Sequence, residues 1–132
     1  MTSILGIDPG EKRVGVAVAD LDTRIITPLV VLKNNRTFIS ELKKLYDEYN
    51  FNTVVVGIPL TSSGLEGKQA QKALALAKKI KLQLPVAIKF QDERHTSRLA
   101  LTKLQITGHD KSKVDALAAV LILESWLARS KS

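Results

Sequence analysis

Hydrophobic and polar positions along this 132-residue chain follow two periods, one typical of strands and one typical of helices. Short apolar runs rich in β-branched residues predict strands. They lie at Ile4–Ile7, Val14–Ala19, Arg24–Leu32, Thr53–Ile58 and Val86–Phe90. Apolar residues three or four positions apart predict helices over about 37–49, 66–82, 96–106 and 112–129. This order, β-β-β-α-β-α-β-α-α, predicts an α/β fold: a mixed five-stranded sheet with helices on both faces.

The same periodicity predicts which helix positions are buried. The expected apolar faces are Phe38, Ile39, Leu42, Leu45, Tyr46 and Tyr49 in the first helix, Ala70, Ala73, Leu74, Ala77 and Ile80 in the second, and Val114, Leu117, Ala118, Leu121, Ile122 and Ser125 in the last. Thr37 is a candidate N-cap and Asn50 a candidate stop for the first helix. Pro28 cannot donate to a ladder, so its strand is expected at an edge or with a bulge.

The stretch Ile4–Asp20 predicts a hairpin with a carboxylate at its mouth. Asp8 follows an apolar strand and precedes Pro9-Gly10, where Pro fixes its own φ and Gly accepts the positive φ of a type II turn. A carboxylate that starts near the core needs a partner, and a cation is the simplest one. Capping of the turn by its side-chain oxygen explains Asp8 equally well from this stretch alone.

Further acids follow other predicted elements. Asp92 and Glu93 follow the fifth strand, a polar loop at 59–64 follows the fourth, and Asp115 lies early in the last helix. The carboxyl ends of parallel neighbours share one edge of a sheet, so these acids are expected to converge near Asp8. Singly, each has an ordinary explanation, such as a cap or a favourable helix-dipole position. Their collection at one edge favours a functional site.

Converging carboxylates provide the hard oxygen ligands that Mg²⁺ or Mn²⁺ prefers. Two such ions about 4 Å apart can activate water and stabilise the leaving oxygen in phosphodiester cleavage. Basic side chains and hydroxyl groups near a helix start are candidate phosphate contacts. They are Lys12, Arg13, Ser62, Ser63 and Arg94.

Composition limits the kinds of molecule that the protein is expected to bind. Twenty Lys and Arg stand against thirteen acids, for a formal net charge of +7, which suits a polyanion such as nucleic acid. A basic surface that only confers solubility is the simpler alternative. The absence of cysteine excludes a disulfide framework and a thiolate metal site. No apolar run is long enough to span a bilayer, and no targeting segment precedes the first strand, so we expect a cytoplasmic protein with no membrane partner.

Four motifs together resemble the YqgF/RuvX family of the RNase H-like superfamily, described as pre-16S rRNA nucleases and earlier as Holliday junction resolvases. They are GIDPG with KRVGVAVAD, VVVGIPL with a polar loop, DERHTSRLA, and VDALAAVLILESWL, in that order. The resemblance covers nearly the whole chain and implies that 1–132 is a single RNase H-like nuclease domain.

By position, the resemblance implies that Asp8, Glu93 and Asp115 are catalytic metal ligands, with Asp92 as an alternative or supporting ligand. It implies cleavage of structured RNA at the 5′ end of pre-16S rRNA during ribosome biogenesis, with four-way junction DNA as the alternative substrate. A monomer suffices for trimming an RNA end, whereas paired junction cuts favour a homodimer.

Two other classes stay open. A nucleic-acid-binding module with a vestigial site would bind in a salt-dependent manner without cleavage. An ATP-handling phosphotransferase of the sugar-kinase and actin type also begins with an Asp-containing hairpin. It is disfavoured because the chain has no Gly-rich P-loop pattern with a Lys.

Overall fold

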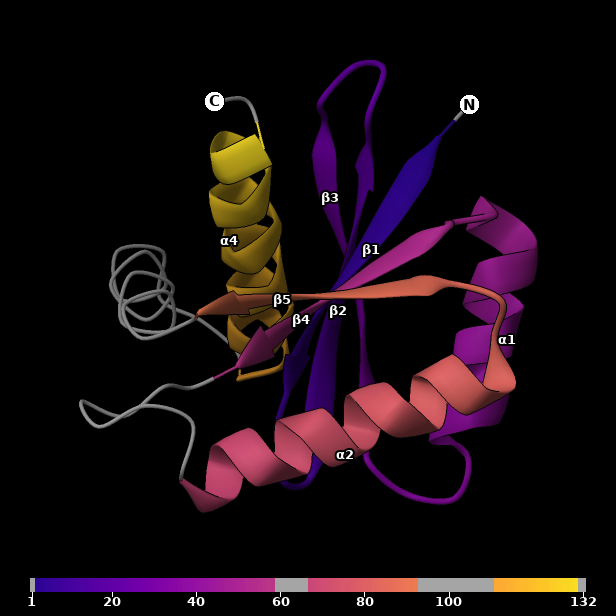
Figure 1. The fold of residues 1–132 in the computed structure, drawn as a ribbon, viewed down its shortest axis with the longest axis vertical. Coiled ribbons are helices and arrows are strands. Elements are labelled where there is room, and N and C mark those ends of the chain that lie inside the picture. The colour runs from indigo at the N-terminus through magenta and orange to yellow at the C-terminus, as the bar shows by residue number, and fades with distance from the viewer. Residues whose placement is uncertain (1, 59–66, 93–110, 131–132) are drawn as a thin grey trace.

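The protein is described by a computed structural model, which covers residues 2–58, 67–92 and 111–130 (Figure 1). In the last stretch, side chains are described for 116–129. The predicted helix near 96–106 and the polar loop at 59–64 therefore lie outside the described residues.

The described residues form one five-stranded sheet and three helices. The strands are β1 (Ser3–Pro9), β2 (Arg13–Asp20), β3 (Ile26–Lys33), β4 (Thr53–Ile58) and β5 (Ala87–Asp92). The helices are α1 (Phe38–Tyr49), α2 (Lys68–Gln83) and α4 (Lys111–Ser130). Each agrees within a few residues with the range expected from the sequence.

The sheet has the strand order β3-β2-β1-β4-β5. β2 runs antiparallel to both β1 and β3, whereas β4 is parallel to both β1 and β5. The carboxyl ends of β1, β4 and β5 therefore lie at one edge, as the sequence predicted. Pro28 lies in the edge strand β3, next to the register shift between Val16 and Ala17, so both expectations for this proline are confirmed.

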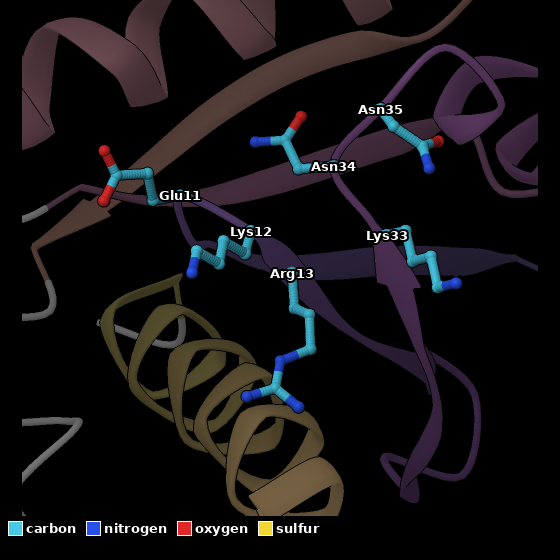
Figure 2. Close-up of a pocket in the computed structure, with 6 residues that line it drawn as sticks. All are labelled: Glu11, Lys12, Arg13, Lys33, Asn34 and Asn35. Atoms are coloured by element: carbon cyan, nitrogen blue, oxygen red, sulfur yellow. The ribbon is translucent and has the colours of Figure 1, made fainter.

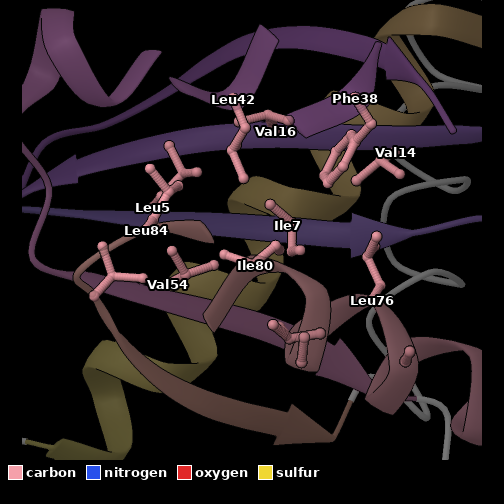
Figure 3. Packing of buried hydrophobic residues seen from close by; sticks show 14 of the residues in the cluster. Leu5, Ile7, Val14, Val16, Phe38, Leu42, Val54, Leu76, Ile80 and Leu84 are labelled. Carbon is pink, nitrogen blue, oxygen red and sulfur yellow. The ribbon is translucent and has the colours of Figure 1, made fainter. Parts of the chain in front are cut away.

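Helices cover both faces of the sheet, which confirms the predicted α/β arrangement. One core cluster joins the sheet to α1 and α2 and includes Leu5, Ile7, Phe38, Leu42 and Ile80 (Figure 3). The other joins the opposite face to α4. Both termini are at the same end of the molecule in Figure 1, so α4 begins where β1 ends and runs back along the sheet.

Two predicted helix faces need correction. In α2, Leu76 is buried and Leu74 is 38% exposed, because α2 is rotated so that Leu74 lines a surface groove beside β5. In α4, the predicted face omitted Ala119, Val120 and Leu123, which pack on the sheet. An Ala-rich helix buried over much of its circumference carries no clear amphipathic signal, and this explains the error.

The predicted caps and turn were partly wrong. Thr37 occupies the N-cap position of α1 but makes no side-chain cap bond, because its hydroxyl donates to Asn35 Oδ1 (2.7 Å). Asn50 ends α1 in the left-handed conformation (φ 52°), as expected. β1 continues through Pro9, and Gly10 does not have the positive φ of the predicted turn. Glycine is needed there because a Cβ would overlap the Arg13 carbonyl oxygen.

α4 lies unusually close to β1 at Gly6. A Cβ on Gly6 would overlap the Leu123 side chain, starting at Cγ, which leaves no room for even one methyl group. Gly6 precedes Asp8 by two residues on the same face of β1. This contact therefore fixes the distance between the helix that carries Asp115 and the strand that carries Asp8.

We expect Gly6→Ala to lower the free energy of unfolding by about 1–3 kcal/mol, because the added methyl group overpacks the contact with Leu123. Urea unfolding measures the change. Adding Leu123→Ala to this variant is expected to cost less than Leu123→Ala costs alone in the original protein. Fully additive costs would contradict the proposed contact.

Candidate active site

Asp8 lies at the carboxyl end of β1, half-buried and opposite Gly15 of β2. Side chains alternate between the two faces of a strand. Leu5 and Ile7 belong to the core under α1 and α2, whereas Ile4 packs with α4. The alternation therefore places Asp8 on the α4 face, at the edge where the parallel strands end.

Asp92 reaches the same edge but lies on the other face. It is the last residue of β5 and is level with Ile58 of β4. Ile88 and Phe90 alternate with Gln91 and therefore share the face of β5 to which Asp92 belongs. Both line a groove with α2. Gln91, of the opposite parity, is buried and accepts a hydrogen bond from Arg129 Nη1 of α4 (3.0 Å). The pleat thus separates Asp92 from Asp8, which is a finding that sequence spacing alone did not give.

The remaining predicted ligands are only partly located. Asp115 is the fifth residue of α4, so its backbone belongs to the helix that covers the Asp8 face, but its side chain lies outside the described residues. Glu93, Arg94, Ser62 and Ser63 also lie outside them. Within the described parts of the chain, no group of three or more acids or histidines is close enough to hold a metal ion. The full ligand set accordingly stays a prediction.

A basic cleft of about 450 Å³ opens between the β1–β2 turn, which begins after Asp8 and Pro9, and the turn after β3 (Figure 2). Its described lining residues are Glu11, Lys12, Arg13, Lys33, Asn34 and Asn35. Lys12 and Arg13 were predicted phosphate contacts, and Arg13 extends toward α4 in Figure 2. Lys33, Asn34 and Asn35 were missed, because only the β2–β3 register brings the turn after β3 to this edge.

Glu11 is an acid in this basic cleft, and an ion pair satisfies it. Lys72 of α2 donates to Glu11 Oε1 at 2.7 Å. The hydrogen bond and the charge of Lys72 hold the pKa of Glu11 below its ordinary value. Both side chains are largely exposed, so the pair is expected to contribute little stability. Its main effect is to direct the Glu11 charge toward α2.

Comparison with known proteins identifies the family. The model of the family described as "RuvX: Holliday junction resolvase" matches residues 2–129. The chain belongs to the RuvX family. The resemblance read from the four motifs is thereby confirmed.

Relatives of this RuvX-family chain include two proteins named "Putative pre-16S rRNA nuclease". The one from Sulfurihydrogenibium sp. is 39% identical, covering 98% of this chain and 92% of the relative. The one from Thermosynechococcus vestitus is 34% identical, covering 100% and 92%. These matches extend over nearly the whole length of this chain and of each relative.

A solved structure agrees with the RNase H-like fold of this RuvX-family chain. Thermus thermophilus RuvC in complex with a Holliday junction substrate matches with a TM-score of 0.63 at 17% identity, covering 100% of this chain and 98% of that one. At this identity the likeness concerns the fold alone. No helix in the described parts of the RuvX-family chain is long and apolar enough to cross a membrane.

We expect Lys72→Met to raise the pKa of Glu11 toward its ordinary value, since both the hydrogen bond and the positive charge are removed. Because the pKa is lowered in the folded state, the pair stabilises the fold above the pKa of an unfolded Glu. This contribution is lost as the pH falls through the folded value. A carboxyl-carbon NMR titration measures the shift. Lys68→Met, one helical turn away, is the control, and equal shifts in both variants would contradict the pairing.

Proposed function

We propose that this protein is a divalent-metal-dependent nuclease that hydrolyses phosphodiester bonds of structured RNA. The observation that carries the proposal is the position of Asp8 on the α4 face, at the edge where three parallel strands end and where the turn that follows β1 lines a basic cleft. Two further findings support the proposal: the chain belongs to the RuvX family, and its fold is similar to that of RuvC. The residues 1–132 would act as a single nuclease domain.

The donor chemistry fits Mg²⁺ or Mn²⁺. Asp8 is half-buried and supplies carboxylate oxygens, the ligand type that these hard cations prefer. Glu93 and Asp115 would complete the set, as the family resemblance implies. A divalent cation, when bound, supplies Lewis acidity to phosphodiester hydrolysis. Asp8 would fix its position, and the packing of α4 at Gly6 would keep the Asp115 backbone at a constant distance.

Glu93 is the better candidate of the two acids at the end of β5. Asp92 has the parity of Ile88 and Phe90, which line the groove with α2, so its carboxylate belongs to the face opposite Asp8. A ligand on that face would have the sheet between itself and Asp8. We therefore propose that Asp92 has a supporting role and that Glu93 acts as the ligand.

The cations near Asp8 would position the substrate. Lys12 lies in the β1–β2 turn and Arg13 begins β2 at the same edge, and exposed charges of this kind bind phosphate oxygens. Arg94, Ser62 and Ser63 are proposed further phosphate contacts from sequence. The names of the relatives support pre-16S rRNA as the substrate. The family resemblance would place the cut at its 5′ end, and processing of this RNA would imply a cytoplasmic location. Trimming one RNA end requires a monomer or at most a weak homodimer.

We expect Asp8→Asn to lower the cleavage rate by more than about 100-fold, since loss of a metal ligand exceeds the roughly 10- to 100-fold cost of losing one of its supporting partners. The assay uses Mg²⁺ or Mn²⁺ with a hairpin RNA carrying a 5′ extension, and in parallel a four-way DNA junction. Asp47→Asn is the control, because Asp47 is an exposed residue of α1.

Cleavage of the RNA by the original protein but not by Asp8→Asn supports the proposal. Paired cuts in the junction would instead make it a resolvase, for which the RuvC complex provides the structural precedent. Binding of both substrates without cleavage of either would favour a binding module.

Substitutions at the neighbouring acids separate their roles. We expect Glu93→Gln to abolish cleavage as Asp8→Asn does, and Asp92→Asn to retain most of it, because the pleat places Asp92 on the other face. Single-turnover cleavage rates across a Mg²⁺ titration measure both variants. The assignment is wrong if Asp92→Asn is the more damaging change.

A further inference from the structure

A groove between α2 and β5 is lined mainly by apolar side chains, and we call it the α2–β5 groove. Its volume is about 300 Å³, and its described lining residues are Leu74, Ala77, Lys78, Lys81, Ile88 and Phe90. Leu74 and Phe90 are 38% and 39% exposed, so each of these large apolar side chains keeps more than a third of its surface in contact with water. The groove lies on the face of the sheet that α1 and α2 cover, opposite α4 and Asp8.

β5 forms an edge of the sheet in the described part of the chain, because it pairs only with β4 (Figure 1). The pairing runs in one continuous register from Ala87 to Asp92, without a bulge. β5 also contains no proline. Natural proteins use bulges, prolines and charged side chains to keep edge strands from pairing further, and of these β5 has only charged side chains. This edge is therefore able to accept a further strand.

The backbone groups at this edge belong to residues that also line the groove. The Ala87 N–H donates to the Asn52 carbonyl oxygen (3.0 Å), so the backbone of Ala87 faces β4. Backbone groups of successive residues in a strand point to opposite sides, which directs the N–H and C=O of Ile88 and Phe90 away from β4. A strand added at this edge would pair with Ile88 and Phe90 and would lie alongside the groove.

The charges around the groove favour an acidic ligand. α2 carries five lysines and no acidic residue, and two of these lysines, Lys78 and Lys81, line the groove. The described lining residues include no acid. Lys81 Nζ donates to the Val86 carbonyl oxygen (3.0 Å), which holds its ammonium group near the start of β5. Lys89 adds an exposed positive charge on the other face of β5. Acidic side chains would complement all three lysines.

Two other occupants fit this surface less well. A second copy of the chain, paired edge to edge, would bring its own β5 and its own α2 lysines to this edge, and like charges opposite each other destabilise a strand pair. A nucleic acid would contact the lysines through its phosphates. Leu74, Ile88 and Phe90, however, have no polar side-chain atom with which to bind its backbone.

We propose that β5 and the α2–β5 groove bind an extended segment of a partner protein by strand addition. Two apolar residues at alternate positions of this segment would enter the groove, flanked by acidic residues that meet Lys78 and Lys81. Such binding combines main-chain hydrogen bonds, which provide affinity, with pockets for alternate side chains, which provide specificity. The peptide site and the proposed nuclease site are independent, because they lie on opposite faces of the sheet.

The probe is a synthetic heptapeptide with blocked termini, ETIEITE, whose two isoleucines share one face of a strand with the first and last glutamates. It is titrated to millimolar concentration into ¹⁵N-labelled protein, and Kd is obtained from the amide chemical shifts. We expect the largest changes at the amides of Ile88 and Phe90, because these N–H groups gain hydrogen bonds. The peptide KTIKITK, of opposite charge, is expected to bind at least about tenfold more weakly. Absence of binding by ETIEITE, or shifts confined to other elements, would overturn the proposal.

N-methylated peptides distinguish strand addition from contact with the groove alone. A strand has two hydrogen-bonding edges, and alternate residues contribute to each. Methylation of both isoleucine nitrogens and methylation of both threonine nitrogens therefore block opposite edges of ETIEITE. We expect one form to bind as the parent peptide does and the other to bind at least about tenfold more weakly, because it loses its main-chain bonds. Equal affinities of the two forms contradict strand addition.

Matched substitutions on α2 test the groove itself. Leu74→Ser is expected to raise Kd about fivefold, because the peptide then buries less apolar surface. Leu82→Ser is its control, since Leu82 is 75% exposed and lies outside the groove lining. Lys78→Gln is also expected to raise Kd, with the exposed neighbour Lys79 changed to Gln as its control. Circular dichroism verifies that each variant is folded. The groove assignment is wrong if both members of either pair have the same effect.

The same spectra detect the other two occupants. Shifts of Ile88 and Phe90 that depend on protein concentration in the absence of peptide would assign this edge to a second copy of the chain. Displacement of ETIEITE by a hairpin RNA would assign the groove to nucleic acid. Either result overturns the binding of a partner segment, whereas failure of the cleavage assay leaves it intact.

Discussion

Parallel pairing of β1, β4 and β5 is the constraint on which the candidate site depends. β1 pairs with β4 from Ile4 to Ile7, and β4 pairs with β5 from Thr53 to Ile58. Because the three strands run in one direction, the residues that follow them emerge at a common edge. Segments more than eighty positions apart in the sequence are brought together in this way, and α4 closes one face above them.

The pleat then divides this edge into two chemically different sides. Asp8, Arg13 and Lys33 have the parity that faces α4, whereas Asp92 has the parity that faces α2. A one-residue change of register would exchange these sets. The buried runs Leu5–Ile7 and Val54–Ile58 prevent such a shift, since it would expose their core side chains. Core packing therefore decides which acids can cooperate.

Charge distribution follows the same division. Lys72 on α2 engages Glu11, whereas strand alternation puts Arg13 and Lys33 on the α4 side with Asp8. Two hydrogen bonds from Asn34 determine the spacing within the basic cleft. An edge that carries Asp8 near a basic cleft suits the proposed phosphodiester chemistry, because a carboxylate attracts metal and basic side chains attract a polyanion.

Local pattern by itself determined much of this protein. β-Branched runs gave the five strands, apolar spacing gave α1 and its buried face, and the motifs around Asp8 and Asp115 gave the family, since these signals depend on near neighbours in the chain. Tertiary structure alone decided the rest. The rotation that buries Leu76 instead of Leu74, the close contact at Gly6, the face of Asp92 and the pairing of Arg13 with Lys33 all depend on which distant elements pack together. The periodicity of a helix does not specify which strands it packs against. The alternation of a strand separates its residues into two sets, but only the assembled core shows which set faces which helix.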